Sequence, residues 1–245
     1  ILHATATPYR DRSHFDAQDL LENGSDKAHG LSTGWLNRAV ATMQGSYPAI
    51  ELGANIPLVL RGDAKVTSWA PSILPSVDDE FLSRVMQMYD NDPLLMNAVS
   101  EAQAMQEVSG GNGRGRGTKS HIDIMKKAAS FMSDATGSRI GAIDMGGWDT
   151  HANQGLEKGN LAGNMKRLAE GLIAFRSGMG DTWKNTAVLV VTEFGRTVKA
   201  NGTGGTDHGT ASVAFLLGGG VNGGRVIGDW PSLSRLYENR SYARQ

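Results

Sequence analysis

Hydrophobic and polar residues follow two kinds of pattern along this chain. Short runs of apolar residues, such as Ala187 to Val191, are typical of buried strands, and longer stretches with apolar positions three and four residues apart are typical of helices. The predicted strands lie at Ile1 to Thr7, in a pair within Ala49 to Leu60 that is broken by Pro57, and at Arg139 to Asp144, Thr186 to Thr192 and Ala211 to Leu217. The predicted helices are Asp11 to Leu21, ended by Asn23-Gly24, then Thr33 to Gln44, Asp78 to Tyr89, Pro93 to Val108, a helix from Ile122, and Asn160 to Arg176.

The order of these elements predicts the fold class. From Ile122 onward helices alternate with short apolar strands, which favours a mainly parallel sheet covered on both faces. We therefore expect an α/β fold with three layers, α/β/α, formed by a single domain over residues 1–245. A segment rich in glycine and arginine, residues 109–118, is expected to be a mobile surface loop. The chain starts inside a predicted strand and stops without a finishing element, so we expect the fold to be truncated at both ends.

Carboxylates and imidazoles follow the later strands, at the points where these strands end. In sheets of this class, ligands bind beyond the carboxyl ends of the strands, so one crevice could hold all of these side chains. Asp, Glu and His are also the usual ligands of divalent cations. The sequence therefore predicts a metal site, and its candidate ligands are Asp144, Asp149, His151, Glu193, Asp207 and His208.

The composition narrows the chemistry further. The chain has 245 residues, a net charge of -1 and a pI near 6.7, which gives no reason to expect nucleic acid or an anionic membrane as a partner. It contains no cysteine, so disulfides, thiolate metal sites and cysteine nucleophiles are excluded. No apolar run approaches the roughly 20 residues that a transmembrane helix needs.

Four motifs carry a resemblance to a known family. They are Trp148 to Gln154, Thr192 to Thr197, Gly204 to Thr210 and Gly228 to Pro231. Together they resemble a bacterial family described as domain of unknown function 1501. That resemblance implies a fold of the alkaline phosphatase and sulfatase superfamily and a twin-arginine export signal, hence a periplasmic or secreted protein.

The resemblance to the superfamily also implies roles for individual residues. Alkaline phosphatases carry an acid, an Asp five residues later and then a His-Ala-Asn within a zinc-binding loop, and Asp144, Asp149 and His151 are similar. Their later His, placed just before a strand, resembles His208. The superfamily usually has an adjacent Asp-His pair between these motifs, whereas this chain has Glu193-Phe194, so one imidazole ligand is absent.

The same resemblance implies a nucleophile at the start of the first helix. In the superfamily this residue begins a helix that ends at a glycine about ten residues later, which points to Ser13 or His14, before Gly24. A hydroxyl group at a helix N-terminus suits this role, because the free backbone N–H groups stabilise an anionic intermediate.

Structural alternatives stay open at several of these positions. Ser13 can simply cap the first helix, and His14 can pack against neighbouring aromatic rings. Glu193 can form a structural ion pair with Arg196. Asp207 can bind a metal directly or orient the adjacent imidazole.

The sequence thus supports two hypotheses of different classes. The leading one is a metal-dependent hydrolase in the cell envelope that acts on a small anionic phosphate or sulfate ester, with one or two divalent cations. Zinc suits the imidazoles, and Ca²⁺, Mg²⁺ or Mn²⁺ suits the carboxylates. The alternative is a non-catalytic metal- or ligand-binding envelope protein that retains the fold.

Overall fold

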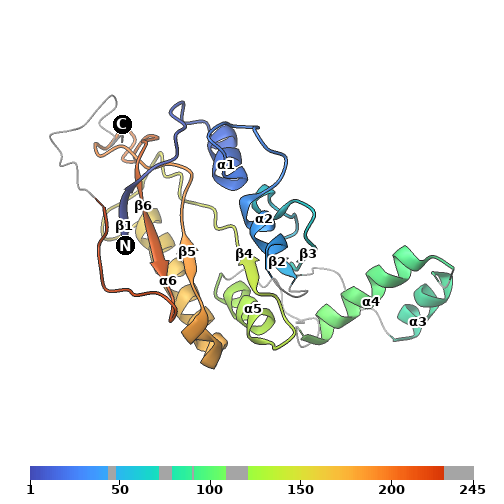
Figure 1. Cartoon of the computed structure of the whole chain (residues 1–245). Helices are drawn as coiled ribbons and strands as arrows, with labels where there is room; N and C mark the ends of the chain where they lie inside the picture. Colours follow the sequence, from blue (N-terminus) through green and yellow to red (C-terminus); the bar gives the residue numbers. More distant parts are fainter. Residues whose placement is uncertain (44–47, 72–78, 90, 109–120, 229–245) are drawn as a thin grey trace.

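The computed structural model describes residues 1–43, 48–71, 79–89, 91–108 and 121–228, and contains two three-stranded sheets with helices around them (Figure 1). The first sheet is parallel, in the order β3-β2-β4, and consists of β2 (Ala49–Glu51), β3 (Val66–Ser68) and β4 (Ile140–Ala142). The second is antiparallel, in the order β1-β6-β5, and consists of β1 (Leu2–Thr5), β5 (Val188–Val190) and β6 (Ser212–Leu217). The predicted loop at 109–118 lies outside the described residues.

Six α-helices are found close to their predicted positions. Their bounds are α1 His14–Asn23, α2 Trp35–Ala41, α3 Asp79–Met88, α4 Pro93–Val108, α5 His121–Ser133 and α6 Asn160–Met179. Helix α1 ends as the Asn23-Gly24 pair predicts: Gly24 has a φ of 69° and donates its N–H to the Leu20 carbonyl. Helices α3 and α4 extend away from the two sheets (Figure 1). None of the described helices is long and apolar enough to cross a membrane.

The expectation of a mainly parallel sheet is confirmed for only one of the two sheets. Strands β4 and β5 are joined through α6, but β5 and β6 are joined by a loop that contains no helix. A parallel pair needs a crossover connection, usually helical, whereas strands joined by a loop can pair antiparallel. The fold is therefore mixed α/β, and β5 and β6 form an antiparallel pair beside β1.

The predicted strand pair within Ala49 to Leu60 is wrong in its second half. Strand β2 ends at Glu51, and Leu58–Leu60 forms a 3₁₀ turn, η1, instead of a strand. Pro57 precedes this turn, and proline provides no N–H for a sheet ladder. Leu60 is fully buried, so the apolar pattern came from burial of a helical turn.

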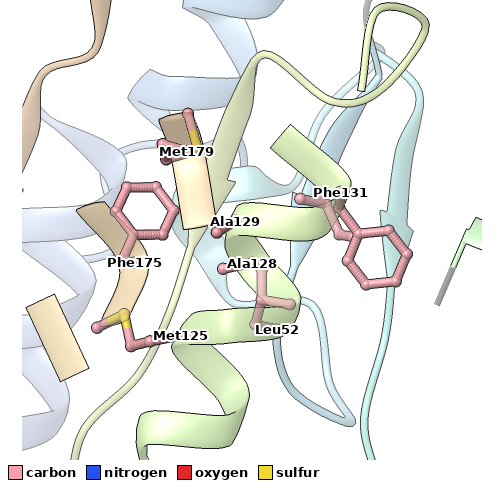
Figure 2. Close-up of a cluster of buried hydrophobic side chains, with 8 residues drawn as sticks. Leu52, Met125, Ala128, Ala129, Phe131, Phe175 and Met179 are labelled. Atoms are coloured by element: carbon pink, nitrogen blue, oxygen red, sulfur yellow. The ribbon is translucent and has the colours of Figure 1, made fainter. Parts of the chain in front are cut away.

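The main hydrophobic cluster lies between α5, α6 and the parallel sheet. Its buried members include Leu52, Met125, Ala128, Ala129, Phe131, Phe175 and Met179 (Figure 2). Small residues let the two helices approach closely, since a Cβ atom added at Gly178 would lie 2.6 Å from the Ala129 Cβ. This packing fixes α6 against α5, and with it the segment between β4 and α6 that carries Asp149 and His151.

Candidate metal centre

Three histidines and one aspartate from distant parts of the chain converge at one point. His14 is the first residue of α1, Asp149 and His151 lie in the loop after β4, and His208 lies in the loop between β5 and β6. His208 Nε2 lies 3.1 Å from His14 Nε2, 3.0 Å from His151 Nε2 and 3.0 Å from Asp149 Oδ1. Asp149 also lies 2.9 Å from His151 Nε2 and 3.3 Å from His14 Nε2. We call these four residues the histidine centre.

Each imidazole has a hydrogen-bond acceptor on its other nitrogen. His14 Nδ1 lies 2.7 Å from a Glu193 carboxylate oxygen, and His208 Nδ1 lies 3.0 Å from the Arg12 carbonyl. His151 Nδ1 lies 3.4 Å from Asp207 Oδ1. A carbonyl or carboxylate can only accept, so in the tautomer with the proton on Nδ1 each ring donates to this partner and leaves the lone pair of Nε2 available to a cation. In the other tautomer each Nε2 donates to the Asp149 carboxylate.

In the first of these tautomers the three Nε2 atoms and the Asp149 carboxylate are all electron-pair donors. Such a set is suited to a cation, and His14, Asp149 and His208 in particular offer ligand atoms within 4.8 Å of one another. Ligands about 2.05 Å from a tetrahedral zinc ion are separated from each other by about 3.3 Å. The separations among His14, Asp149 and His208, 3.0 to 3.3 Å, are close to this value, and His151 lies 2.9 Å from Asp149 and 3.0 Å from His208 but outside that group of three.

Asp149 has a cationic neighbour in addition to the imidazoles. Arg196 donates to Asp149 Oδ1 and also to the hydroxyl and carbonyl oxygens of Thr206. Partial burial raises the pKa of Asp149, but the hydrogen bond and charge of Arg196, with a smaller effect of His208, outweigh it and lower the pKa overall. Arg196 thus pairs with Asp149, and not with Glu193 as the structural alternative from the sequence would have it. The Arg196–Asp149 pair keeps Asp149 ionised.

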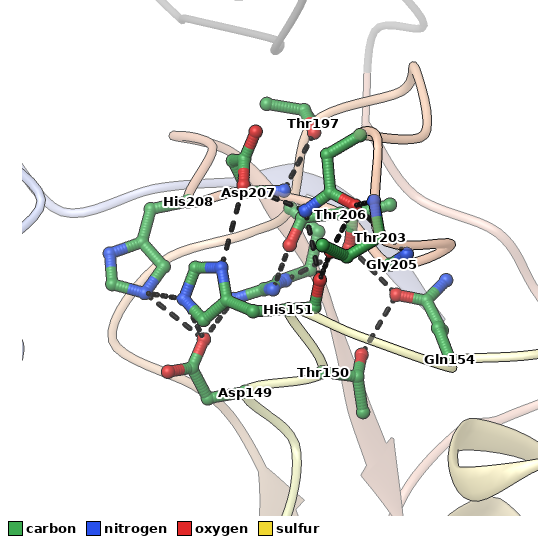
Figure 3. Close-up of polar contacts among 12 residues, drawn as sticks. Asp149, Thr150, His151, Gln154, Thr197, Thr203, Gly205, Thr206, Asp207 and His208 are labelled. Atoms are coloured by element: carbon green, nitrogen blue, oxygen red, sulfur yellow. Dashed lines mark hydrogen bonds and ion pairs between the residues drawn. The ribbon is translucent and has the colours of Figure 1, made fainter.

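Two loops that are far apart in sequence hold His151 and His208 together (Figure 3). The His151 carbonyl accepts hydrogen bonds from the Asn201 amide and from the Thr203 hydroxyl, at 2.9 and 2.6 Å. Gln154 accepts from the hydroxyls of both Thr150 and Thr206, at 2.8 and 2.7 Å. The geometry of the centre thus depends on backbone and hydroxyl contacts between these loops.

The contact between α1 and the centre depends on the residues just before the helix. Arg12 has a φ of 60°, a conformation that a non-glycine residue rarely adopts, and its carbonyl accepts from His208. The ring of Phe194 packs 4.8 Å from the ring of His14 and 4.7 Å from that of His208. The side chains of the centre stay open to solvent, with His208 the least exposed at 21% and His151 the most at 47%.

The structure brings most of the predicted site residues into this region, in different positions. Glu193 and Asp207 lie behind imidazoles, where they orient the rings. The pKa of Asp207 is lowered, first by its hydrogen bond from Asn201 and then by His151. Ser13 occupies the N-cap position of α1 without a side-chain capping hydrogen bond, and its side chain interacts with the Tyr9 phenol. Its role as nucleophile stays a prediction.

Asp144 lies apart from the ligand atoms of the centre, beside a residue that the sequence analysis missed. Glu51, at the end of β2, is only 3% exposed, and its Oε2 atom has no hydrogen-bond partner among the described residues. Burial, together with the smaller effects of the Asp144 and Glu22 charges, raises the pKa of Glu51 to about 7. The available signal was the acid at the end of the run Ala49 to Glu51, the same pattern as at Asp144 and Glu193.

Comparison with known proteins identifies a family but no characterised relative. Residues 3–244 match the family described as Protein of unknown function (DUF1501). No curated protein and no solved structure matches the chain. The match includes every residue of the histidine centre.

Proposed function

The chain belongs to the DUF1501 family of proteins of unknown function, and we propose that it is a zinc-dependent hydrolase of phosphate or sulfate esters. The observation that carries this proposal is the convergence of three Nε2 atoms on Asp149, each imidazole being oriented by an acceptor on Nδ1. An alkaline phosphatase-like fold and a periplasmic or secreted location, both implied by the family resemblance, belong to the same proposal.

The donor set favours zinc over the harder cations. Three imidazoles and one carboxylate form a tetrahedral set typical of zinc, whereas Ca²⁺ and Mg²⁺ prefer six or more oxygen ligands. A divalent cation held there would polarise an ester oxygen and lower the pKa of a hydroxyl or water molecule. Glu193 and Asp207 would fix the ring orientations, and Arg196 would hold Asp149 in its ionised form.

The likeness to alkaline phosphatases is supported by the order of the ligand motifs, with one departure. The superfamily's adjacent Asp-His pair is replaced by Glu193-Phe194, which removes one imidazole. His14 supplies a third imidazole from the start of α1, and the carboxylate of Glu193 supports it from behind. The ring of His14 thus takes the place of the missing imidazole. This supports a single zinc ion whose ligands differ from those of the superfamily, and gives no support for a second zinc ion.

Ser13 is our candidate for the nucleophile. It directly precedes His14 at the N-terminus of α1, where backbone N–H groups would stabilise an anionic intermediate. The observation that favours the non-catalytic alternative concerns the same residue: its hydroxyl interacts with Tyr9, and no contact with the histidine centre is recorded. The two functions therefore make opposite predictions for Ser13→Ala.

The proposal is tested by measuring zinc content and ester hydrolysis on the same protein samples. We expect the zinc-loaded chain to hydrolyse p-nitrophenyl phosphate or p-nitrophenyl sulfate, and His208→Ala to lose at least about 100-fold in both zinc affinity and turnover, because a ligand is removed. The matched control is His29→Ala. His29 also contacts two carboxylates, Asp16 and Asp19, but it is exposed and belongs to no group of candidate metal ligands among the described residues. Its replacement should therefore leave both quantities unchanged.

A further variant separates a hydrolase from a binding protein. If Ser13 is the nucleophile, Ser13→Ala should abolish turnover and leave zinc content intact. If Ser13 has no catalytic role, the same change should spare turnover and zinc content alike. Tight zinc binding without hydrolysis of either ester would favour the non-catalytic alternative. If His208→Ala retains its zinc, and chelation removes zinc from neither this variant nor the wild type, the metal centre is refuted.

A further inference from the structure

A polar pocket of about 680 Å³ adjoins the histidine centre. One wall is the loop after β4 and includes two members of the centre, Asp149 and His151. The opposite wall is the first part of α6, from Asn160 to Arg167. The pocket therefore offers space next to the centre for the remainder of a bound ester.

The wall formed by α6 presents one helix face to the pocket. Asn160, Gly163, Asn164 and Arg167 are three or four residues apart, which places them on the same side of the helix. A Cβ atom added at Gly163 would meet nothing within 4 Å, so the space beside the helix is open there. Gly163 therefore leaves space beside the guanidinium group of Arg167, a residue two turns from the start of α6.

Arg167 is the cation of this pocket, and its side chain is held in place. Asn164 is 5% exposed and bridges the two walls, donating to the Gly147 carbonyl and accepting from the Arg167 guanidinium. No ion pair between Arg167 and a described carboxylate is recorded. A positioned guanidinium with free donors is suited to bidentate binding of a carboxylate, phosphate or sulfate group.

The charge on the other wall is already balanced. Asp149 is the acidic residue of the pocket, and its carboxylate is paired with Arg196 and with the imidazoles of the centre. Arg167 is therefore free to attract a negative charge from the ligand. A neighbouring cation, Lys166, instead pairs with Glu170 one turn along the helix, at 3.8 Å.

We infer that this pocket is a subsite for a second anionic group of the substrate, with Arg167 as the residue that binds it. The substrate class is thus an ester whose phosphate or sulfate group lies at the histidine centre and which carries a further carboxylate, phosphate or sulfate. This inference deepens the proposed function and rests on it.

The test uses phosphonates as non-hydrolysable probes, titrated calorimetrically into the zinc-loaded chain. Phosphonocarboxylates with one, two or three methylene groups are each compared with the alkylphosphonate of the same length, and zinc content is measured after each titration. For the best-fitting length, we expect the carboxylate to increase affinity about tenfold in the wild-type protein. The same increase should be lost in Arg167→Met and partly kept in Arg167→Lys, since lysine retains the charge without the fork of donors.

The matched control is Lys166→Met, which removes a neighbouring exposed charge from the same helix and should keep the full increase. A carboxylate effect that persists unchanged in Arg167→Met overturns the subsite while leaving the proposed function standing, as does the absence of any carboxylate effect at all three lengths. If no phosphonate of either series binds the zinc-loaded protein, both the subsite and the hydrolase proposal fail.

Discussion

Among single residues, Glu51 places a carboxyl group in an environment that opposes its charge. Its side chain is buried at the end of β2, near the carboxylates of Asp144 and Glu22. Burial and, to a smaller extent, these two charges raise its pKa to about 7. The folded protein therefore binds a proton at Glu51 that the unfolded chain, with a pKa near 4.5, has already released above about pH 5.

This difference predicts a specific pH dependence of stability. For a pKa raised in the folded state, the stabilisation is fully present below the unfolded value and is lost as pH rises through the folded value. Wild-type protein should therefore lose about 3 kcal/mol of unfolding free energy through Glu51 between about pH 4.5 and about pH 8. Glu51→Gln, which cannot ionise, should flatten the curve over this interval and be the more stable protein at about pH 8.

The measurement is denaturant unfolding of both proteins at several pH values. Every other group is the same in the two proteins, so the difference between their curves reports Glu51. Asp149 and Asp207, whose pKa values are lowered, titrate below this interval and do not contribute. Parallel curves for wild type and Glu51→Gln would contradict the account of this residue.

The residue scale also shows how far the sequence could identify the site. Asp149, His151 and His208 were predictable because each follows a strand end, a position where ligands collect in α/β sheets. His14 was predicted only as a substitute nucleophile, because it starts a helix and no strand-end pattern marks it. Its place in the centre depends on how α1 meets the loop before β6, and no local pattern records that long-range contact.

Among the elements, the paired loops around His151 and His208 depend on glycine for close approach. A Cβ atom added at Gly205 would overlap the backbone carbonyl of His151, whereas one added at Gly202 would meet nothing within 4 Å. Gly205 therefore lets residues 201–206 lie directly against the loop that carries His151.

Two alanine substitutions test this arrangement. Gly205→Ala should force the loops apart, lower the unfolding free energy by about 1 to 3 kcal/mol and weaken zinc binding by at least about tenfold, because His151 is displaced. Gly202→Ala lies in the same loop and should change neither quantity. Thermal unfolding and zinc titration of the two variants provide the comparison, and equal behaviour of the pair would show that the close approach at Gly205 does not position the centre.

The elements themselves were predicted unevenly, for physical reasons. The helices were found near their expected bounds because α1, α5 and α6 carry amphipathic periodicity and α1 ends in a left-handed glycine. The extended prediction at Leu58–Leu60 failed because a short apolar run does not distinguish a buried strand from a buried helical turn.

At the scale of the whole molecule, the topology of the sheets was only partly predictable. The alternation of helices and strands predicted an α/β fold with a parallel sheet, and β2, β3 and β4 form such a sheet, although no strand was expected at β3. It did not predict that β6 pairs antiparallel with both β5 and β1. That pairing joins the N-terminal strand to a strand more than two hundred residues away, and β1 leads into the segment that carries Arg12 and His14.

The histidine centre is therefore a property of the assembled fold, since its residues come from α1, from the loop after β4 and from the loop before β6. Metal bound there should stabilise the folded chain, because the unfolded chain cannot bring these segments together.

The most direct test is X-ray absorption spectroscopy of the zinc-loaded chain at the zinc edge. We predict a four-coordinate ion with three imidazole nitrogens and one carboxylate oxygen, at about 2.0 to 2.1 Å. The imidazole contribution should fall by one in His14→Ala and stay unchanged in His29→Ala. A shell of oxygen atoms alone, or an imidazole contribution that is the same in His14→Ala as in wild type, would contradict the central claim that these three histidines form one metal centre.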